Sequence, residues 1–299
     1  MVRMPASASV SDPLAPTSRL TLRDRLLLSW LAEHYVLTSQ QVTQALYPSG
    51  RAAQKRLTLL HRIGAVSRFR FAQTEEQSSS YRYTLGPLGV HLFPTPYTDP
   101  GNAAAKPPRT HLERRARIIR HIEAGSHLLG VNQFFIDLHT ATRTTMPEAR
   151  LQRWWSEQHA TAAYAQVIRP DGHGVWCAGD RQVGFFLEFD NDTEDVPRVM
   201  RKLAGYVRIT EFGPRYPVLL WVPDRRREAS LLRALAGIRT PMAVATAVHG
   251  NNPAGPVWAL PGDPGPRLHL HELPSDHGPD EATNPNFFHG PDRQALAAT

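Results

Sequence analysis

The sequence is poor in cysteine and has no long uninterrupted apolar run. Its single cysteine, Cys177, cannot form an internal disulfide and excludes a cysteine-based zinc finger. No stretch approaches the roughly 20 consecutive apolar residues that span a bilayer. Residues 1–18 lack the basic, then apolar, then small-residue order of a signal peptide. These absences predict a soluble, cytoplasmic protein without a membrane partner.

The charge is positive and unevenly distributed. The chain has 34 Lys+Arg against 27 Asp+Glu, a net charge of +7. Residues 1–125 hold 17 basic and 8 acidic residues (+9), whereas residues 126–299 hold 17 and 19 (−2). A polyanion such as DNA is therefore expected to bind the N-terminal half.

The N-terminal pattern is that of a winged helix-turn-helix. Residues 1–18 are rich in Ser, Pro and Ala, and are expected to be disordered. Apolar residues at helical spacing then predict a helix beginning near Leu20 and another at 49–63 that Gly64 ends, and an N-cap at Thr38-Ser39 predicts a short helix at 39–46. Two aromatic-rich alternating segments, 65–71 and 81–85, predict a hairpin with a polar loop. We assign residues 19–93 to this unit.

The rest of the chain is predicted to form a linker, a helical connector and an α/β unit. The Pro, Gly and Ala content of 94–109 predicts a linker. Residues 110–146 are expected to form a helical connector, with helices at 110–129 and 131–142. Residues 147–248 are expected to form the α/β unit. Within the last, we expect helices at 147–158, 197–209 and 225–237, and strands at 164–168, 174–178, 183–189 and 217–222. Nine prolines and six glycines in residues 250–299 predict that the tail, from 249, is mostly disordered. The predicted fold class is multidomain, α+β and α/β.

Basic residues on the third helix and the hairpin are the candidate DNA contacts, because this helix enters the major groove in such motifs. They are Arg51, Gln54, Lys55, Arg56 and Arg62 on the helix, and Arg68, Arg70 and Arg82 on the hairpin. A solvated basic helix is the alternative. The hairpin aromatics are expected to be core rather than platforms for bases.

Acidic residues at strand ends form the candidate metal site. Strand alternation places Glu188 and Asp190 on one face, and Asp171 at the end of a neighbouring strand could complete a set of oxygen ligands. Such hard ligands suit Mg²⁺ or Mn²⁺. The alternative is that this acidic stretch is a solvated surface loop.

Two further side chains lie one helical turn apart on the following helix. Lys202 and Tyr206 share a face, and Lys202 is one of only three lysines in the chain. A compact ammonium can approach a scissile phosphate where a planar guanidinium fits poorly. Glu157 is a candidate accessory ligand, with a solvent-facing position as the alternative.

These motifs resemble a known fold. The segments Arg169-Pro170-Asp171-Gly172, Phe186 to Asp190 with Thr193-Glu194, and Lys202 to Tyr206 resemble the PD-(D/E)XK nucleases. The whole order, from Leu20 to Gly237, resembles the replication-relaxation proteins of actinobacterial plasmids and integrative elements. The resemblance implies a restriction-endonuclease-like αβββαβ domain at 147–248. The lysine usual two residues after the glutamate is replaced by Asp190, and Lys202 stands where these nucleases have glutamine.

The resemblance also implies an activity. Asp171 and Glu188, with Asp190, would hold Mg²⁺ or Mn²⁺, while Lys202 and Tyr206 would serve DNA cleavage or nicking. The expected partners are plasmid or mobile-element DNA and plasmid replication or transfer proteins. The alternative is a non-catalytic replication or transcription regulator with an inactive nuclease-like domain. A tyrosine relaxase is a third reading, but the sequence shows no His cluster to hold its metal.

Overall fold

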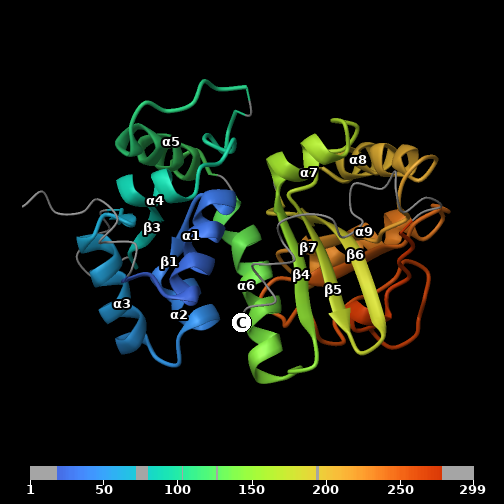
Figure 1. The fold of residues 1–299 in the computed structure, drawn as a ribbon. Coiled ribbons are helices and arrows are strands. Elements are labelled where there is room, and N and C mark those ends of the chain that lie inside the picture. Colours follow the sequence, from blue (N-terminus) through green and yellow to red (C-terminus); the bar gives the residue numbers. More distant parts are fainter. Residues whose placement is uncertain (1–18, 72–79, 103, 126, 193–194, 278–299) are drawn as a thin grey trace, which may run out of the picture.

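The computed structural model describes residues 19–71, 80–102, 104–125, 127–192 and 195–277 (Figure 1). The disorder expected at 1–18 and beyond 277, most of the polar hairpin loop, and the Thr193-Glu194 motif lie outside these residues. Within them the protein is an α+β structure with a three-stranded and a five-stranded sheet.

The N-terminal part consists of helices packed on a small antiparallel sheet. The helices expected at 39–46 and 49–63 and both hairpin strands are confirmed, and a short additional strand makes the sheet order β1-β3-β2. The elements are α1 (Leu22–His34), β1 (Leu37–Thr38), α2 (Ser39–Leu46), α3 (Gly50–Arg62), β2 (Val66–Phe69), β3 (Arg82–Leu85) and α4 (Pro87–Leu92).

Side-chain caps define where these helices begin. Thr21 and Asp24 form a capping box at α1, and Thr38 and Gln41 form another at α2. The Ser49 side chain accepts a hydrogen bond from a backbone N–H at the start of α3. Each cap satisfies backbone donors that a helix leaves without an internal partner.

Two helices connect the N-terminal part to the large sheet. They are α5 (His111–Glu123) and α6 (Leu128–Thr144), close to the connector helices that we predicted. In Figure 1, α6 runs between the N-terminal helices and the sheet. No helix in the described part of the chain is both long and apolar enough to cross a membrane.

The five-stranded sheet has the order β4-β5-β6-β7-β8. The strands β4, β5 and β6 pair antiparallel, whereas β6, β7 and β8 pair parallel. The elements are β4 (Arg150–Ser156), α7 (Glu157–Ala163), β5 (Gly172–Ala178), β6 (Arg181–Phe189), α8 (Val196–Ile209), β7 (Val218–Val222), α9 (Arg225–Leu235) and β8 (Val244–Val248).

Both faces of this sheet are covered. On one face Phe134 and Phe135 of α6 pack on Trp221 and Trp154 of the strands, with ring centroids 5.2 Å apart in each pair. This core continues without interruption into the helices of the N-terminal part. On the other face, side chains of α7, α8 and α9 form a second core. The alternation along β6 therefore sends Leu187 to the first core and Glu188 toward α8.

Two of the expected elements at the start of the large sheet are wrong. Residues 150–156 form strand β4, not part of a helix over 147–158, and residues 164–168 form no strand. The aromatic pair Trp154 and Trp155 explains the difference, because each ring is buried on its own side of the sheet. A strand buried on both faces lacks the simple alternation that would have distinguished it from a helix.

The predicted disorder after residue 249 is wrong for residues 250–277. Trp258, Leu270 and Leu273 are fully buried against the core on the α6 side of the sheet. Backbone bridges join Thr246 to Ala259 and Trp258 to Leu268. The prolines and glycines of this segment shape an ordered strap across the sheet.

Candidate functional site

Glu188 lies near the end of β6 and makes two side-chain contacts with α8. Its Oε2 accepts a hydrogen bond from Lys202 Nζ at 3.0 Å, and its Oε1 accepts one from the Tyr206 hydroxyl at 2.5 Å. Lys202 and Tyr206 reach the same carboxylate because they are one helical turn apart. The structure therefore brings together three of the four residues that the sequence assigned to catalysis.

The Glu188 carboxylate is held in an environment that disfavours its charge. Its side chain is 9% exposed, and burial, with the nearby Asp171 carboxylate, raises its pKa to about 7. Lys202 and Tyr206 offset part of this effect. Near neutral pH the site can thus lose or gain a proton, and a cation bound beside it would favour the charged form.

Asp171, the fourth residue, immediately precedes β5. Its Oδ2 accepts a hydrogen bond from the backbone N–H of Phe189 at 2.7 Å, and its Oδ1 lies 2.7 Å from Nε2 of His127. Its own N–H donates to the Leu187 carbonyl. Two strands thus fix Asp171 beside Glu188.

His127 is the site residue that the sequence did not reveal. It immediately precedes α6, 44 residues before Asp171 in the chain, and no local pattern connects the two. Burial opposes its protonation, but the hydrogen bond and charge of Asp171 outweigh that effect and raise the pKa of His127. The imidazole therefore holds the Asp171 carboxylate in place.

These side chains line a pocket of about 150 Å³ between the ends of β5 and β6, the start of α6 and the helix α8. Polar groups on its wall come from His127, Asp171, Glu188 and Lys202, and an apolar side is formed by Val199, Leu203 and Leu220. A few converging polar groups in a partly apolar concavity are typical of a ligand-binding site.

Asp190 is on the same side of the sheet as Glu188, yet it has a different partner. Its Oδ2 accepts a hydrogen bond from Nε of Arg227 on α9 at 2.7 Å, and its Oδ1 accepts one from the N–H of Asp192. The side chains of Asp190 and Arg227 are 9% and 8% exposed. Asp190 is therefore half of a buried ion pair, although it borders the pocket.

Glu157, the accessory candidate, begins α7 near Asp171. Its carboxylate accepts a hydrogen bond from Nε of Arg169. Burial is the main effect that raises its pKa, and the Asp171 charge adds to it. Glu157 borders a neighbouring cavity that also includes His127 and Asp171, so it is not a purely solvent-facing glutamate.

The ligands that this site offers to a divalent ion are a pair of carboxylates, those of Asp171 and Glu188. No group of three or more His, Cys, Asp or Glu side chains in the described residues is arranged to hold a metal ion. The Asp171 carboxylate nevertheless lies in the same pocket as Glu188 and helps to raise the pKa of Glu188. Mg²⁺ commonly uses one or two carboxylates together with water and substrate phosphates, and these two residues fit that role.

The predicted DNA-contact residues of α3 divide into two groups. Arg51, Gln54, Lys55 and Arg62 are exposed. Arg56 instead donates from Nε to Oδ1 and Oδ2 of Asp24, at 2.9 and 3.1 Å, and from Nη2 to the Arg19 carbonyl. Because the Asp24 side chain is fully buried, Arg56 joins α3 to the start of α1.

The hairpin arginines lie over aromatic rings. Arg68 and Arg70 are 4.5 and 5.3 Å from the centroid of Tyr81, and Arg82 is 4.7 Å from that of Phe71. Burial lowers the pKa of Arg82. Tyr83 is fully buried, as expected for a core aromatic, whereas Phe69, Phe71 and Tyr81 are half-buried.

A comparison with protein families identifies the wider relationship of the chain. The family model described as replication-relaxation matches residues 28–218. This range includes α3, the hairpin, the carboxylate pocket and α8. No curated protein and no solved structure matches the chain.

Proposed function

The chain belongs to the replication-relaxation family, and we propose that it binds plasmid or mobile-element DNA and cleaves or nicks it in a metal-dependent reaction. The family supports a role in replication. The observation that carries the catalytic part is the Glu188 carboxylate, which Lys202 and Tyr206 contact directly and whose pKa Asp171 helps to raise. Perturbed carboxylates with a nearby cation in a pocket are typical of catalytic sites.

Asp171 and Glu188 would hold the metal ion, and Asp190 would not, because Arg227 already neutralises it. When bound, Mg²⁺ or Mn²⁺ would supply an acidified water and neutralise charge on the phosphate. His127 holds the Asp171 carboxylate, and the Tyr206 hydroxyl orients the Glu188 carboxylate. Lys202 Nζ would stabilise the negative charge that develops on the scissile phosphate.

The α/β part would correspond to a PD-(D/E)XK nuclease domain in which the catalytic lysine lies on α8 rather than on the strand. Lys202 Nζ is 3.0 Å from the glutamate that such a lysine would serve. Tyr206 is buried with its hydroxyl against Glu188, a position that suits an orienting group rather than a relaxase nucleophile.

The N-terminal part would serve as a winged helix-turn-helix. Three helices followed by a hairpin are the order of this motif, and α3 presents Arg51, Gln54, Lys55 and Arg62 on its exposed face. Arg68 and Arg70 on the hairpin would lie along phosphates. Arg56 is not among these contacts, because its guanidinium is committed to Asp24.

A plasmid-nicking assay tests the proposal. Purified protein with Mn²⁺ or Mg²⁺ should convert supercoiled plasmid to open circles, and EDTA should prevent this. Glu188→Gln should abolish the cleavage, because the amide removes a charge that the divalent ion needs. Lys202→Met should reduce the rate by about 10²-fold or more, by analogy with the loss of oxyanion donors. Glu211→Gln removes an exposed acidic charge just after α8, and this control should keep the parental rate.

Titration calorimetry with Mn²⁺ separates the roles of the two residues. Glu188→Gln should lose metal affinity, whereas Lys202→Met should retain it, because an ammonium is not a ligand. If Glu188→Gln binds Mn²⁺ as well as the parent does, or if Lys202→Met cleaves at the parental rate, the assigned chemistry is wrong.

A second candidate is a DNA-binding regulator without hydrolysis. The observation that favours it is Asp190, which occupies the usual lysine position of the strand and is locked in an ion pair with Arg227. This candidate predicts DNA binding by the parent and no nicking in any metal. A protein-linked DNA end would instead indicate relaxase chemistry.

A further inference from the structure

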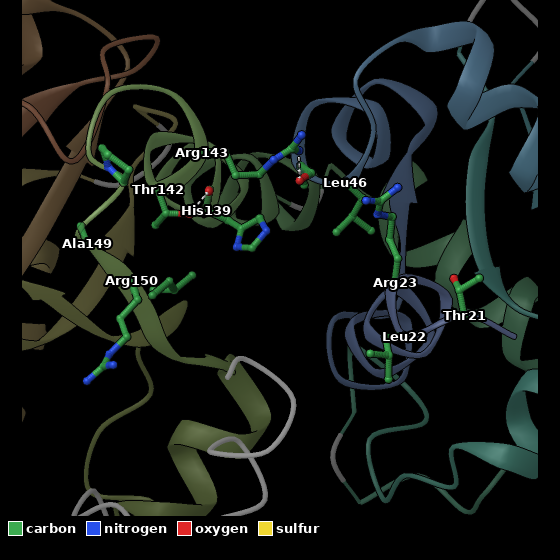
Figure 2. A pocket seen from close by; sticks show the side chains of 12 residues that line it. Thr21, Leu22, Arg23, Leu46, His139, Thr142, Arg143, Ala149 and Arg150 are labelled. Carbon is green, nitrogen blue, oxygen red and sulfur yellow. Dashed lines mark hydrogen bonds between the residues drawn. The ribbon is translucent and has the colours of Figure 1, made fainter. Parts of the chain in front are cut away.

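A large cavity lies at the junction between the N-terminal helices and the sheet. Its volume is about 680 Å³, and it is lined by residues of α1, α2, α6 and the start of β4. In Figure 2 the Arg150 side chain lies at the edge of the cavity and points away from Arg23 and Arg143. It is distinct from the carboxylate pocket. Arg150, on its rim, pairs with Cys177 at one end of β5, whereas Asp171 and Glu188 are at the other end, about 20 Å away by strand geometry.

The charged side chains that line this cavity are basic. Arg23, Arg143 and Arg150 line it together with His139, and none of the described lining residues is acidic. Of the acids that border it in sequence, Asp24 is paired with Arg56, and Glu148 is an exposed residue between two lining positions. Burial and the charge of Arg143 lower the pKa of His139 to about 4, so the imidazole is neutral at pH 7.

The three arginines have different roles in the fold. Arg143 donates to the carbonyls of Gln44 and Ala45 at the end of α2. Arg23 lies with its guanidinium 5.3 Å from the Tyr47 ring, and Arg150 is exposed at the start of β4. Figure 2 shows Arg23 and Arg143 extending toward Leu46 from opposite walls.

The position of Arg23 links the cavity to α3. Tyr47 is two residues before Ser49, the N-cap of α3, and Asp24, next to Arg23, holds Arg56 of the same helix. A backbone that runs along the start of α3 can therefore continue past Arg23 into the cavity. The walls do not suit an apolar peptide, because Leu46 and Leu151 are buried and Leu22 is the one large apolar lining residue that is strongly exposed.

We propose that this basic groove, lined by Arg23, Arg143 and Arg150, binds the phosphate backbone of the DNA that α3 contacts. The inference rests on the DNA binding proposed above and extends it to a second surface. Arginine and lysine contacts to phosphates position a protein on DNA without reading its sequence. The groove would thereby fix how the sheet is placed relative to the DNA held by α3.

The test is the salt dependence of duplex binding by the full chain. Arg23→Gln/Arg150→Gln removes two groove charges and spares Arg143, which donates hydrogen bonds to carbonyls of α2. The control, Arg226→Gln/Arg239→Gln, removes two exposed arginines from α9 and the loop after it. Affinity is measured by fluorescence anisotropy between 50 and 200 mM salt, and folding by circular dichroism.

Two lost phosphate contacts should reduce the slope of log affinity against log salt by roughly two units. Over a fourfold rise in salt, the parent should therefore lose about tenfold more affinity than the groove variant does. The control should keep the parental slope. A groove variant with the parental slope, or a control that changes as much, would overturn the groove and leave the DNA-binding proposal intact.

Cross-linking locates the DNA directly. Thr142 lines the groove, and Thr142→Cys should react with DNA that carries a pyridyl disulfide on its backbone, because the cysteine thiolate forms the new disulfide while pyridine-thiol leaves. The buried Cys177 should react little. Failure to cross-link a DNA that is bound would count against the groove. If the parent binds no DNA at all, the proposed function fails and the groove inference fails with it.

Discussion

At the scale of single residues, the Glu188 carboxyl controls how the stability of the site changes with pH. Its pKa in the folded protein is about 7, against an ordinary value of 4.5. The folded state therefore holds this proton over a range in which the unfolded state has released it. Ionising Glu188 without a bound cation costs free energy, because the group is buried beside Asp171.

The higher pKa of Glu188 in the folded state determines in which direction stability changes with pH. The free energy of unfolding of the metal-free parent should fall as pH rises from about 4.5 to 7, by up to about 3 kcal/mol from this group alone. Glu188→Gln should remove that decrease, so the variant should be the more stable protein at pH 8. Urea unfolding of both proteins at pH 5 and pH 8 measures the effect. A parent and variant with parallel pH profiles would contradict it.

Two adjacent basic residues of α3 should respond differently to mutation. Arg56→Ala leaves the fully buried Asp24 carboxylate without its partner, and we expect a loss of about 2 kcal/mol in the free energy of unfolding. Lys55→Ala removes an exposed side chain, so stability should stay within about 0.5 kcal/mol, while DNA affinity falls. Thermal unfolding and anisotropy on both variants give the comparison. Equal stabilities would mean that the Asp24 ion pair contributes nothing.

At the scale of elements, a buried arginine attaches α5 to the end of α1. Arg114 is 2% exposed, and its guanidinium donates to the carbonyls of Leu31, Ala32 and Tyr97. Burial lowers the pKa of Arg114 to about 10. The contacts satisfy carbonyls in the last turn of α1 that would otherwise lack donors.

Arg114→Ala should therefore be far more damaging than Arg115→Ala on the same helix. We expect a loss of about 3 kcal/mol for the first, which leaves buried carbonyls without donors, and less than about 1 kcal/mol for the half-buried Arg115. Differential scanning calorimetry on both variants tests this difference. Similar losses would show that the capping contacts of Arg114 carry little stability.

Local sequence patterns predicted many helices and strands, but not the side-chain contacts between them. The capping residue Thr38 indicated where α2 begins, because a cap acts within one turn, and the apolar spacing of residues 53 to 63 indicated α3. The faces of Glu188 and Lys202 followed from strand and helix periodicity. The contacts of His127, Arg56 and Asp190 could not be predicted, because each partner is at least 32 residues away in the chain and pairing depends on the tertiary fold.

At the scale of the whole molecule, the segment 250–277 is part of the core. Composition predicted disorder because Pro and Gly outnumber large apolar residues there. The few that are present, Trp258, Leu270 and Leu273, are nevertheless fully buried. Burying each of them stabilises the fold by about 2 kcal/mol. This stabilisation accounts for an ordered segment where the average composition predicts disorder.

Truncation distinguishes this strap from the rest of the tail. A chain that ends after His277 keeps every described residue and should unfold near the parental temperature. A chain that ends after His249 loses the three buried side chains and should lose on the order of 5 kcal/mol of stability, enough to unfold many domains. Thermal melts of both truncations test this, and a stable short form would show that the strap is dispensable.

The helix α6 connects the two places where we expect DNA to act on the protein. Its first residue follows His127, which holds Asp171, and near its last turn Arg143 lines the basic groove. The helix is about 25 Å long, and its buried residues pack in the core that the N-terminal helices share with the large sheet. The helix thus connects the basic groove directly to the imidazole that contacts Asp171. Under the proposed function, α6 would act as a spacer that sets the distance between DNA held in the groove and the carboxylates that act on it.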